Sequence, residues 1–273
     1  MITVEEILNG EGVLIAAHRG CSGGNIIENT IKAFEVALMH GSHIIEADIA
    51  TTADDVPVLI HDGMEGRLLT KPANVKQMTY AEIGALRYRN SNSAEIGQPI
   101  EKLDTVLEHF KGRAVINLDR CWDSMDIVLR TVERHNMLDQ VIIKSPVVKK
   151  YIQVIEEMEK PFCYMPIVKT ITELEQACTS RLNIIAAELI FENDDSPLLA
   201  PDILEKLKRR NIQLWANAIN LNDYKRLSAG HDDYTSLFVD PDNGWGWLID
   251  KGFRIIQTDW PGLLASFLKQ RAM

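Results

Sequence analysis

Short apolar segments recur along the chain and alternate with segments whose apolar residues follow the 3.6-residue period of an amphipathic helix. Residues 13–17, VLIAA, are apolar throughout, which is typical of a strand buried on both faces of a parallel sheet. Later segments of the same character predict strands at residues 114–119, 141–144, 162–168, 184–189, 212–216 and 254–259. Helices are expected before and between them, at residues 101–110, 124–135, 147–159, 171–179 and 201–209.

The segment 43–62, HIIEADIATTADDVPVLIHD, breaks this alternation because it contains two apolar strands joined by turn-forming residues. Glu46 and Asp48 are two positions apart, so both carboxylates lie on one face of the first strand. If the strands form a hairpin in which Thr52 pairs with Pro57, Asp48 lies opposite His61, with Cβ atoms about 5 Å apart. Two carboxylates spaced in this way more often belong to a solvent-exposed face of a strand. Whether they form a functional site therefore depends on the rest of the chain.

The order of elements predicts an α/β protein with a (β/α)8 TIM barrel. If residues 57–61 only return the hairpin, eight parallel strands remain, each reached through a helix. The length of 273 residues suits this fold, for which about 250 residues are typical. A doubly wound open sheet is the alternative, but no glycine-rich phosphate-binding motif follows the first strand.

The chain is predicted to form a single domain over residues 1–273, since it contains no low-complexity linker, repeat or change in composition. Residues 63–100 are mostly polar and are expected to be an insertion over the barrel mouth, with one short helix opened by the capping box Thr79–Glu82. Residues 3–8 are expected to form a short helix at the barrel bottom. Asn29 is expected to cap the helix that follows the first strand.

Polar residues stand where the predicted strands end, and in a barrel these ends form the active site. They are His18 and Arg19, Glu46 and Asp48, Asp119, Lys144, Glu188, Asn217, Gln257 and Asp259. Carboxylate oxygens are ligands that Mg²⁺ and Ca²⁺ prefer, and histidines can carry protons. We therefore interpret the mouth as a site for one divalent cation (Glu46, Asp48, Asp119) and two acid–base histidines (His18, His61).

Cations near this site favour an anionic substrate. Arg19 and Lys144 could hold a phosphate, Arg19 by two parallel hydrogen bonds. Trp215 lies near the end of its strand, where filling the core and lining a substrate pocket are equally compatible with the pattern.

Composition narrows the remaining possibilities. The formal net charge of −10 argues against a nucleic-acid partner. No apolar run is long enough for a membrane span, and the acidic N-terminal residues do not form a signal peptide. The four cysteines have no CxxC spacing and are expected to be reduced. Together these features favour a cytoplasmic protein, and they indicate nothing about its oligomeric state.

Residues 16–62 resemble the glycerophosphodiester phosphodiesterase family in a series of motifs, which are in order AHRG, ENT, AFE, IIEADI and VPVLIHD. A looser similarity to the family continues through the later strands to QTDWP at residues 257–261. The resemblance implies a barrel with an insertion after the hairpin and a divalent cation on Glu46, Asp48 and Asp119. It also implies catalytic histidines at His18 and His61, and a phosphate contact from Arg19. The implied reaction is hydrolysis of glycerophosphodiesters to glycerol 3-phosphate and an alcohol.

The chain departs from the family pattern at two positions. Asp119 stands where a glutamate is common, and Cys121 stands where a lysine is common. Because cysteine cannot replace a cation, either the substrate differs or another cation, such as Lys144, has taken this role. Two alternatives therefore stay open, namely a related phosphodiesterase for lysophospholipids or other headgroups and a non-catalytic ligand-binding descendant. An apolar surface in the 63–100 insertion would favour the first.

Overall fold

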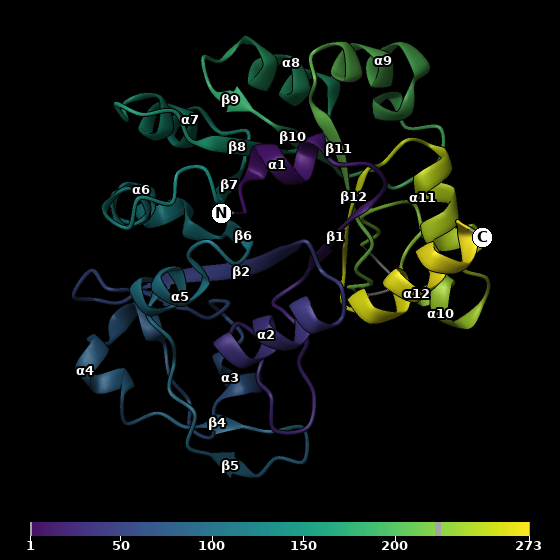
Figure 1. Ribbon diagram of the computed structural model, residues 1–273. Coiled ribbons are helices and arrows are strands. Elements are labelled where there is room, and N and C mark those ends of the chain that lie inside the picture. Colours follow the sequence, from purple (N-terminus) through teal and green to yellow (C-terminus); the bar gives the residue numbers. More distant parts are fainter. Residues whose placement is uncertain (1, 222–224, 273) are drawn as a thin grey trace.

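A closed barrel of parallel strands forms the centre of the computed structural model, which describes residues 2–221 and 225–272 (Figure 1). β1 pairs in parallel with β2 on one side and with β12 on the other, and this closes the ring. In order around the barrel the strands are β1 (Leu14–Ala17), β2 (Ile44–Thr51), β6 (Val115–Asp119), β7 (Val141–Pro146), β8 (Cys163–Val168), β10 (Ala186–Leu189), β11 (Gln213–Asn217) and β12 (Ile255–Thr258). The predicted (β/α)8 barrel is confirmed.

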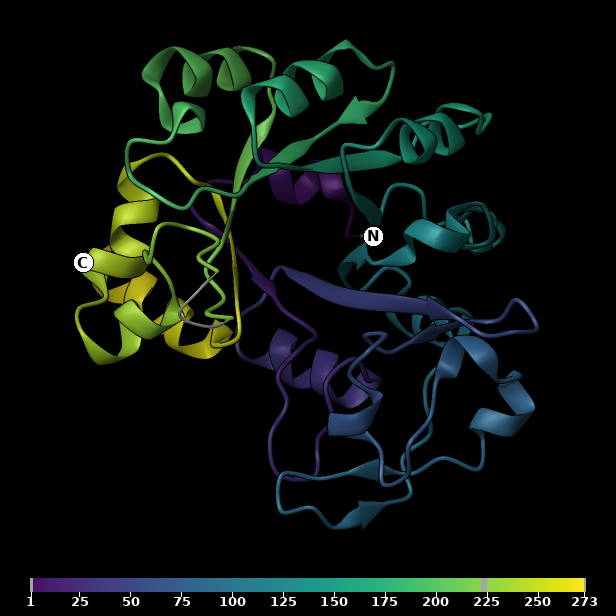
Figure 2. The same ribbon diagram turned by 180° about the vertical axis from the view of Figure 1, so that it is seen from behind.

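Helices surround the barrel and cover its outer surface, as the view from behind also shows (Figure 2). They are α2 (Ile31–Met39), α5 (Leu103–Phe110), α6 (Met125–Arg134), α7 (Lys149–Glu156), α8 (Ile171–Thr179), α9 (Pro201–Arg209) and α12 (Pro261–Arg271). α5 illustrates why they form, since Leu103, Val106, Leu107 and Phe110 follow the helical period and are all fully buried. None of the described helices could cross a membrane, because none is both long and apolar enough.

The connection from β11 to β12 contains several short helices. It contains α10 (Asp233–Phe238), a π-helical turn η4 (Asp242–Gly246) and α11 (Trp247–Asp250). Shorter elements elsewhere are η2 (Cys121–Ser124), β9 (Asn183–Ile184) and η3 (Pro197–Leu199).

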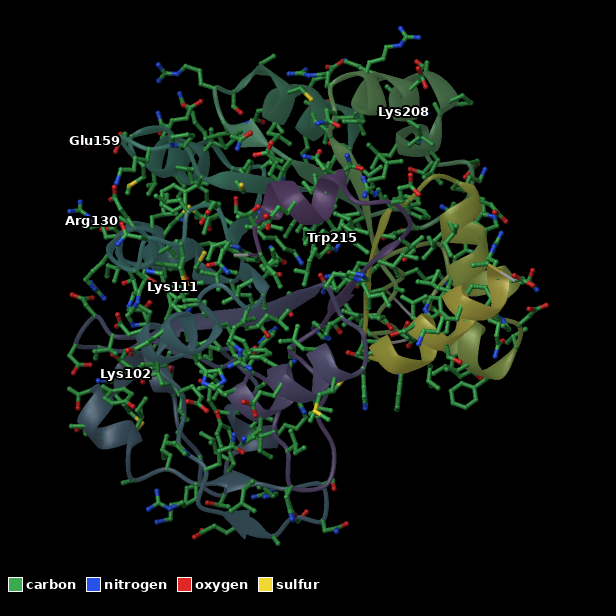
Figure 3. The ribbon with its side chains drawn as sticks, in the orientation of Figure 1. Lys102, Lys111, Arg130, Glu159, Lys208 and Trp215 are labelled. Carbon is green, nitrogen blue, oxygen red and sulfur yellow. The ribbon has the colours of Figure 1, made fainter. Side chains whose placement is uncertain are left out.

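The bottom of the barrel is closed by α1 (Val4–Asn9), as expected. Thr3 and Glu6 form a capping box at its start, and Val4 packs against inward-facing residues of the strands. Trp215 belongs to the same buried cluster and lies within the barrel (Figure 3). The floor beneath the mouth is therefore an apolar layer.

α2 begins one residue later than predicted, because Thr30 caps it and not Asn29. The Thr30 hydroxyl accepts a hydrogen bond from the backbone N–H of Ala33. Asn29 has a left-handed backbone conformation with φ 56°. This conformation leaves its side-chain amide available to β2.

The predicted hairpin is present, but its register was wrong by one residue. β3 (Pro57–Leu59) is antiparallel to β2, and Thr51 pairs with Pro57 in place of Thr52. The Thr52 hydroxyl accepts a hydrogen bond from the backbone N–H of Val56, so Thr52 belongs to the turn. Continued along the ladder, this register puts Ile60, not His61, opposite Asp48.

Residues 63–100 form small elements that pack on the hairpin. These are α3 (Glu65–Leu68), η1 (Val75–Gln77), α4 (Tyr80–Ile83), β4 (Tyr88–Arg89) and β5 (Glu95–Ile96). The predicted capping box of Thr79 and Glu82 opens α4. Apolar residues of this segment form one buried cluster with Val58 and Ile60 of the hairpin. At the barrel mouth, Met64 and Arg67 of the segment line the pocket described below.

Candidate active site

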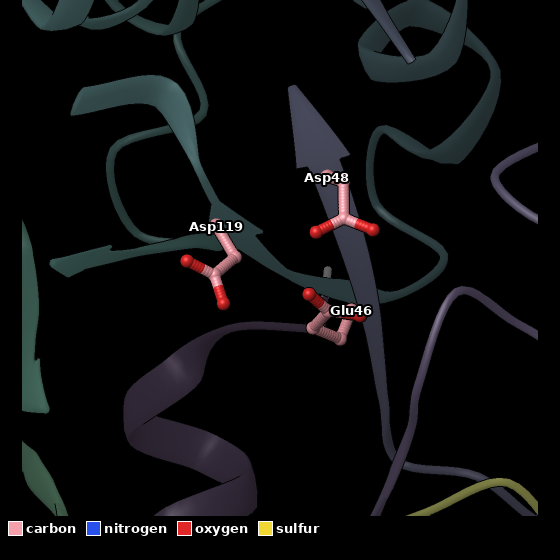
Figure 4. A group of neighbouring side chains, drawn as sticks. All are labelled: Glu46, Asp48 and Asp119. Carbon is pink, nitrogen blue, oxygen red and sulfur yellow. The ribbon is translucent and has the colours of Figure 1, made fainter. Parts of the chain in front are cut away.

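Three carboxylates converge at the mouth-side ends of two adjacent strands (Figure 4). Glu46 and Asp48 come from β2 and Asp119 from β6, and the strand register places Asp48 beside Asp119. One oxygen from each of the three lies within 4.8 Å of the others. The structure thus brings together the side chains that the sequence pointed to as cation ligands.

Two of these carboxylates are almost fully buried, since Glu46 is 1% exposed and Asp48 is 2% exposed. Burial raises the pKa of Glu46, and the neighbouring charge of Asp48 raises it further. The cluster therefore requires compensating positive charge, and oxygen ligands of this kind suit a hard divalent cation.

Arg19 supplies part of this charge from the loop after β1. Its backbone N–H donates a hydrogen bond of 2.9 Å to Glu46, and its Nε lies 2.7 Å from an oxygen of Asp48. Arg19 has φ 55°, and a Cβ on the following Gly20 would lie 2.6 Å from the backbone of Ala33. The HRG sequence is therefore needed to turn the chain so that Arg19 faces the carboxylates.

Glu28 and Asn29 of the ENT motif form hydrogen bonds that fix Arg19 and Asp48. Glu28 accepts hydrogen bonds from Arg19, at 2.9 Å, and Arg67, at 2.6 Å. The Asn29 side chain donates to the Asp48 carboxylate at 3.1 Å and accepts from the Asp48 backbone at 3.0 Å. Periodicity could not identify these contacts, because both residues lie outside the strands.

Lys144 reaches the carboxylate cluster from β7, as the sequence suggested. Its Nζ lies 2.9 Å from Asp119 and 3.1 Å from Glu188, and the side chain is 2% exposed. Two amide side chains also contact this ion-pair network. Gln257 lies 3.4 Å from Lys144 Nζ, and Asn217 donates a hydrogen bond of 3.0 Å to Glu188. Lys144 is therefore a buried counter-ion of Asp119.

His18 follows β1 and is held by the residue that follows β12. Its Nδ1 lies 2.7 Å from a carboxylate oxygen of Asp259. The backbone N–H of Asp259 in turn donates to buried Asp233, at 2.8 Å, and Asp233 also accepts from Trp245 and Thr258. This chain of contacts fixes the imidazole and leaves Nε2 as the nitrogen that can exchange a proton with a ligand.

Replacing Asp259 with asparagine should lower the pKa of His18. Burial lowers this pKa, but the hydrogen bond that the imidazole donates to Asp259 and the charge of Glu46 outweigh burial and raise it. His18 in the native protein should therefore hold its proton to a higher pH than in the variant, as NMR titration of the metal-free proteins would show. Asp194→Asn, which removes the carboxylate beside His231, is the control; an unchanged His18 titration in Asp259→Asn would contradict the role of Asp259.

His61 follows β3 and is partly buried. Its Nδ1 lies 2.7 Å from the backbone oxygen of Asp62, which also leaves Nε2 for chemistry. The Asp62 carboxylate pairs with Arg120 at 2.7 Å, and the Arg120 backbone N–H donates to Asp119. His61 is thus connected to Asp119 on β6 through Asp62 and Arg120, and not through the predicted pairing with Asp48.

Trp215 and Cys121, which the sequence also drew attention to, are both buried and do not line the pocket at the mouth. Trp215 is fully buried in the apolar layer, so its predicted role in substrate binding is corrected to core packing. Cys121 is also buried, and burial raises the pKa of its thiol to about 12. The thiol is therefore neutral and contributes no charge to the site.

A cavity of about 480 Å³ opens beside these residues. His18, Arg19, Glu28, Arg67, Asn220 and Asp259 line it, together with a few apolar side chains. Its size is within the usual range for small-molecule sites. The pocket offers cations, carboxylates and a histidine to a polar ligand.

Comparison with known proteins agrees with this architecture. Residues 164–268 match a family described as a domain of unknown function. A glycerophosphodiester phosphodiesterase of Bacillus altitudinis is 34% identical over 140 residues, which are 48% of this chain and 57% of that protein. The matched part is thus little more than half of this relative.

Solved structures share the fold over nearly the whole chain. A glycerophosphoryl diester phosphodiesterase of Parabacteroides distasonis has a TM-score of 0.79 at 19% identity, covering 99% of this chain and 93% of that one. An Oleispira antarctica phosphodiesterase, solved with the product sn-glycerol-3-phosphate, has a TM-score of 0.67 at 16% identity, covering 93% and 96%. These sequence relatives and structural neighbours agree with the resemblance of the motifs in residues 16–62 to the glycerophosphodiester phosphodiesterase family.

Proposed function

We propose that this protein hydrolyses glycerophosphodiesters to glycerol 3-phosphate and an alcohol with the help of one divalent cation. The observation that carries this proposal is the convergence of Glu46, Asp48 and Asp119 beside Arg19 at the barrel mouth. The names of the relatives and the product recorded in the Oleispira antarctica structure support the same substrate class.

The three carboxylates would hold the cation, and their oxygen atoms suit Mg²⁺ or Ca²⁺. When bound, such an ion polarises the phosphoryl group and neutralises its charge. Arg19 would contact a phosphate oxygen, because this residue lines the pocket and its guanidinium lies next to Asp48 of the cluster. Lys144 balances the charge of Asp119 from the neighbouring strand β7.

His18 and His61 would act as an acid–base pair. Each has Nδ1 occupied by an oxygen acceptor, so each presents Nε2. One takes the proton of the attacking hydroxyl group, and the other gives a proton to the departing alkoxide. Attack by water and attack by the neighbouring glycerol hydroxyl differ in their products, since only the latter forms a cyclic phosphodiester that ³¹P NMR would detect.

Hydrolysis of glycerophosphodiesters would give the protein a role in glycerol and lipid metabolism, with a small molecule as its partner. The net charge of −10 does not suit nucleic acid, and the four free cysteines suit a reducing compartment such as the cytoplasm.

Removing the divalent cation should abolish turnover of glycerophosphocholine, and Mg²⁺ or Ca²⁺ should restore it, since three adjacent carboxylates repel without a cation. The panel should include glycerophosphoethanolamine and lysophosphatidylcholine, assayed with and without chelator. Binding of Mg²⁺ or Ca²⁺ should also raise the Tm of the native protein but not that of the Glu46→Gln variant. Full activity in chelator, with negligible metal content, would remove the cation from the proposal.

A further inference from the structure

A second polar cavity adjoins the active-site pocket on the side of the 63–100 insertion, and we call it the arginine pocket. Its volume is about 420 Å³. The loop after β1 forms one wall, and α3, β4 and the turn between β4 and β5 form the other. Ser22, Glu28 and Arg67 line both cavities, so the arginine pocket begins where the active-site pocket ends.

Hydrogen bonds join the two walls of the arginine pocket. The Asn90 side chain donates to the side-chain oxygen of Asn25 at 2.7 Å, and the Ser91 backbone N–H donates to the Gly24 carbonyl at 3.1 Å. Because the walls are tied to each other, the space between them is formed before a ligand enters.

The wall that the insertion contributes is polar. Large apolar residues of the insertion, including Leu69, Val75 and Tyr88, are at most 1% exposed and pack on the hairpin. The apolar surface that would have favoured lysophospholipids at this insertion is therefore not present among its described residues.

Arg89 gives the arginine pocket a positive charge that lacks a counter-ion in the protein. Tyr88 packs into the buried cluster, so Arg89, the next residue of β4, points to the opposite face. Glu95 lies opposite Arg89 on β5, but its carboxylate accepts a hydrogen bond from Thr70. Within residues 2–221 and 225–272, no carboxylate forms an ion pair with Arg89.

Arg67 adds a second guanidinium group to the lining. Its Nη2 lies 2.6 Å from Glu28, and Glu28 also pairs with Arg19 at 2.9 Å. The charged residues that line the arginine pocket are thus two arginines and one glutamate, and this glutamate is already shared between two guanidinium groups. Positive charge therefore exceeds negative charge here, in a chain whose net charge is −10.

The pairing of the carboxylates shows which substituent suits the site. In a glycerophosphodiester any charge beyond the phosphodiester lies on the alcohol, because glycerol is uncharged. The carboxylates that line the active-site pocket are Glu28 and Asp259, and Asp259 is paired with His18. An ammonium group such as choline would therefore find no unpaired carboxylate among these lining residues, whereas an anionic group would find Arg89.

We propose that the arginine pocket binds a second phosphate group, carried by the alcohol part of the substrate, while the phosphodiester lies at His18 and Arg19. The proposal rests on the proposed phosphodiesterase function and names a substrate class for it, the glycerophosphodiesters of phosphorylated polyols. Arg67 and Arg89 come from different segments, so they can bind different oxygens of one phosphate. Asn90, Ser91 and Ser93 line the same pocket and offer hydrogen bonds to polyol hydroxyls.

Glycerophosphoinositol and glycerophosphoinositol 4-phosphate differ by one phosphate group on the inositol ring. The native protein should have a kcat/KM roughly 5- to 50-fold higher for the phosphorylated substrate, the size expected for charge-assisted hydrogen bonds in a partly open pocket. Arg89→Gln should remove most of this preference, and Arg89→Lys should keep part of it, because lysine retains the charge but not the paired hydrogen bonds. Arg130→Gln is the matched control, since Arg130 is an exposed arginine of α6 that lines neither cavity (Figure 3).

Calorimetry with inositol 4-phosphate tests the arginine pocket without catalysis. The metal-free protein should be used, so that the phosphate cannot bind through a divalent cation. Inositol 4-phosphate should bind the native protein, and Arg89→Gln should raise its Kd by roughly 5- to 50-fold. Inositol without the phosphate should not bind. If neither glycerophosphodiester is hydrolysed, the proposed function fails, and this titration still decides whether the pocket binds phosphate.

Two results would overturn the proposal, once circular dichroism has confirmed that the variants are folded. The first is an equal kcat/KM for the two substrates in the native protein, or a preference that Arg130→Gln reduces as much as Arg89→Gln. The second is an unchanged Kd for inositol 4-phosphate in Arg89→Gln, which would place its phosphate at another cation such as Arg19.

Discussion

His18→Ala should lower kcat for glycerophosphodiesters by about 10²- to 10⁴-fold, the range for loss of a positioned acid or base. The imidazole is held at the mouth by Asp259 at 2.7 Å, so the variant removes a group whose position the fold has fixed. The loss should appear in kcat more than in KM, because proton transfer occurs in the transition state. Steady-state kinetics at saturating cation would measure it.

The fold should survive this change, since His18 lies after β1 and not in the barrel core. His109→Ala is a suitable control, because His109 pairs with Glu35 on the helical layer. His61→Ala should cause a loss of the same order as His18→Ala. Native kcat in a folded His18→Ala protein would mean that another group moves the proton.

The barrel could be predicted from sequence because strand and helix periods are local properties. The parallel strands are apolar runs, and each ends in polar residues where the chain reaches the mouth. The convergence of Glu46, Asp48 and Asp119 could be predicted for the same reason, since the mouth ends of adjacent parallel strands meet. Lys144 followed from its place at the end of β7.

Contacts that depend on single turns could not be predicted. The hairpin register depends on the Thr52 hydroxyl, which caps the turn, and a shift of one residue changes every pair. Asn29 resembles a helix cap in sequence, but its left-handed backbone directs its amide to Asp48. Asp233 accepts a hydrogen bond from the backbone of Asp259, which is 26 residues away, and no local sequence pattern predicts such a contact.

The position of Trp215 shows a different limit of prediction from sequence periodicity. Periodicity indicates that its side chain points into the barrel, but not whether its layer is apolar or polar. The layer is defined by neighbours on other strands, such as Ile44 and Met165, which surround it. Only the assembled barrel distinguishes a pocket wall from core packing.

Lys144→Met should lower kcat/KM by roughly 10- to 1000-fold, as expected for loss of a charge that supports a water-poor site. The ammonium lies 2.9 Å from Asp119 and 3.1 Å from Glu188, and methionine keeps the apolar stem while removing the charge. Cys121, which stands where the family commonly has a lysine, is neutral and cannot compensate.

The same variant should also lose stability, because buried Glu188 and partly buried Asp119 would be left without their counter-ion. Breaking a buried ion pair from one side costs about 3–5 kcal/mol, which urea unfolding of the metal-free protein would measure. Excess divalent cation should restore part of this loss by binding at Asp119, and it should do so less in Lys144→Met with Asp119→Asn. Lys149→Met, at an exposed position of α7, is the matched control. A Lys144→Met protein with native kcat/KM would show that the charge on Asp119 is neutralised in another way, and the site would then need a different cation.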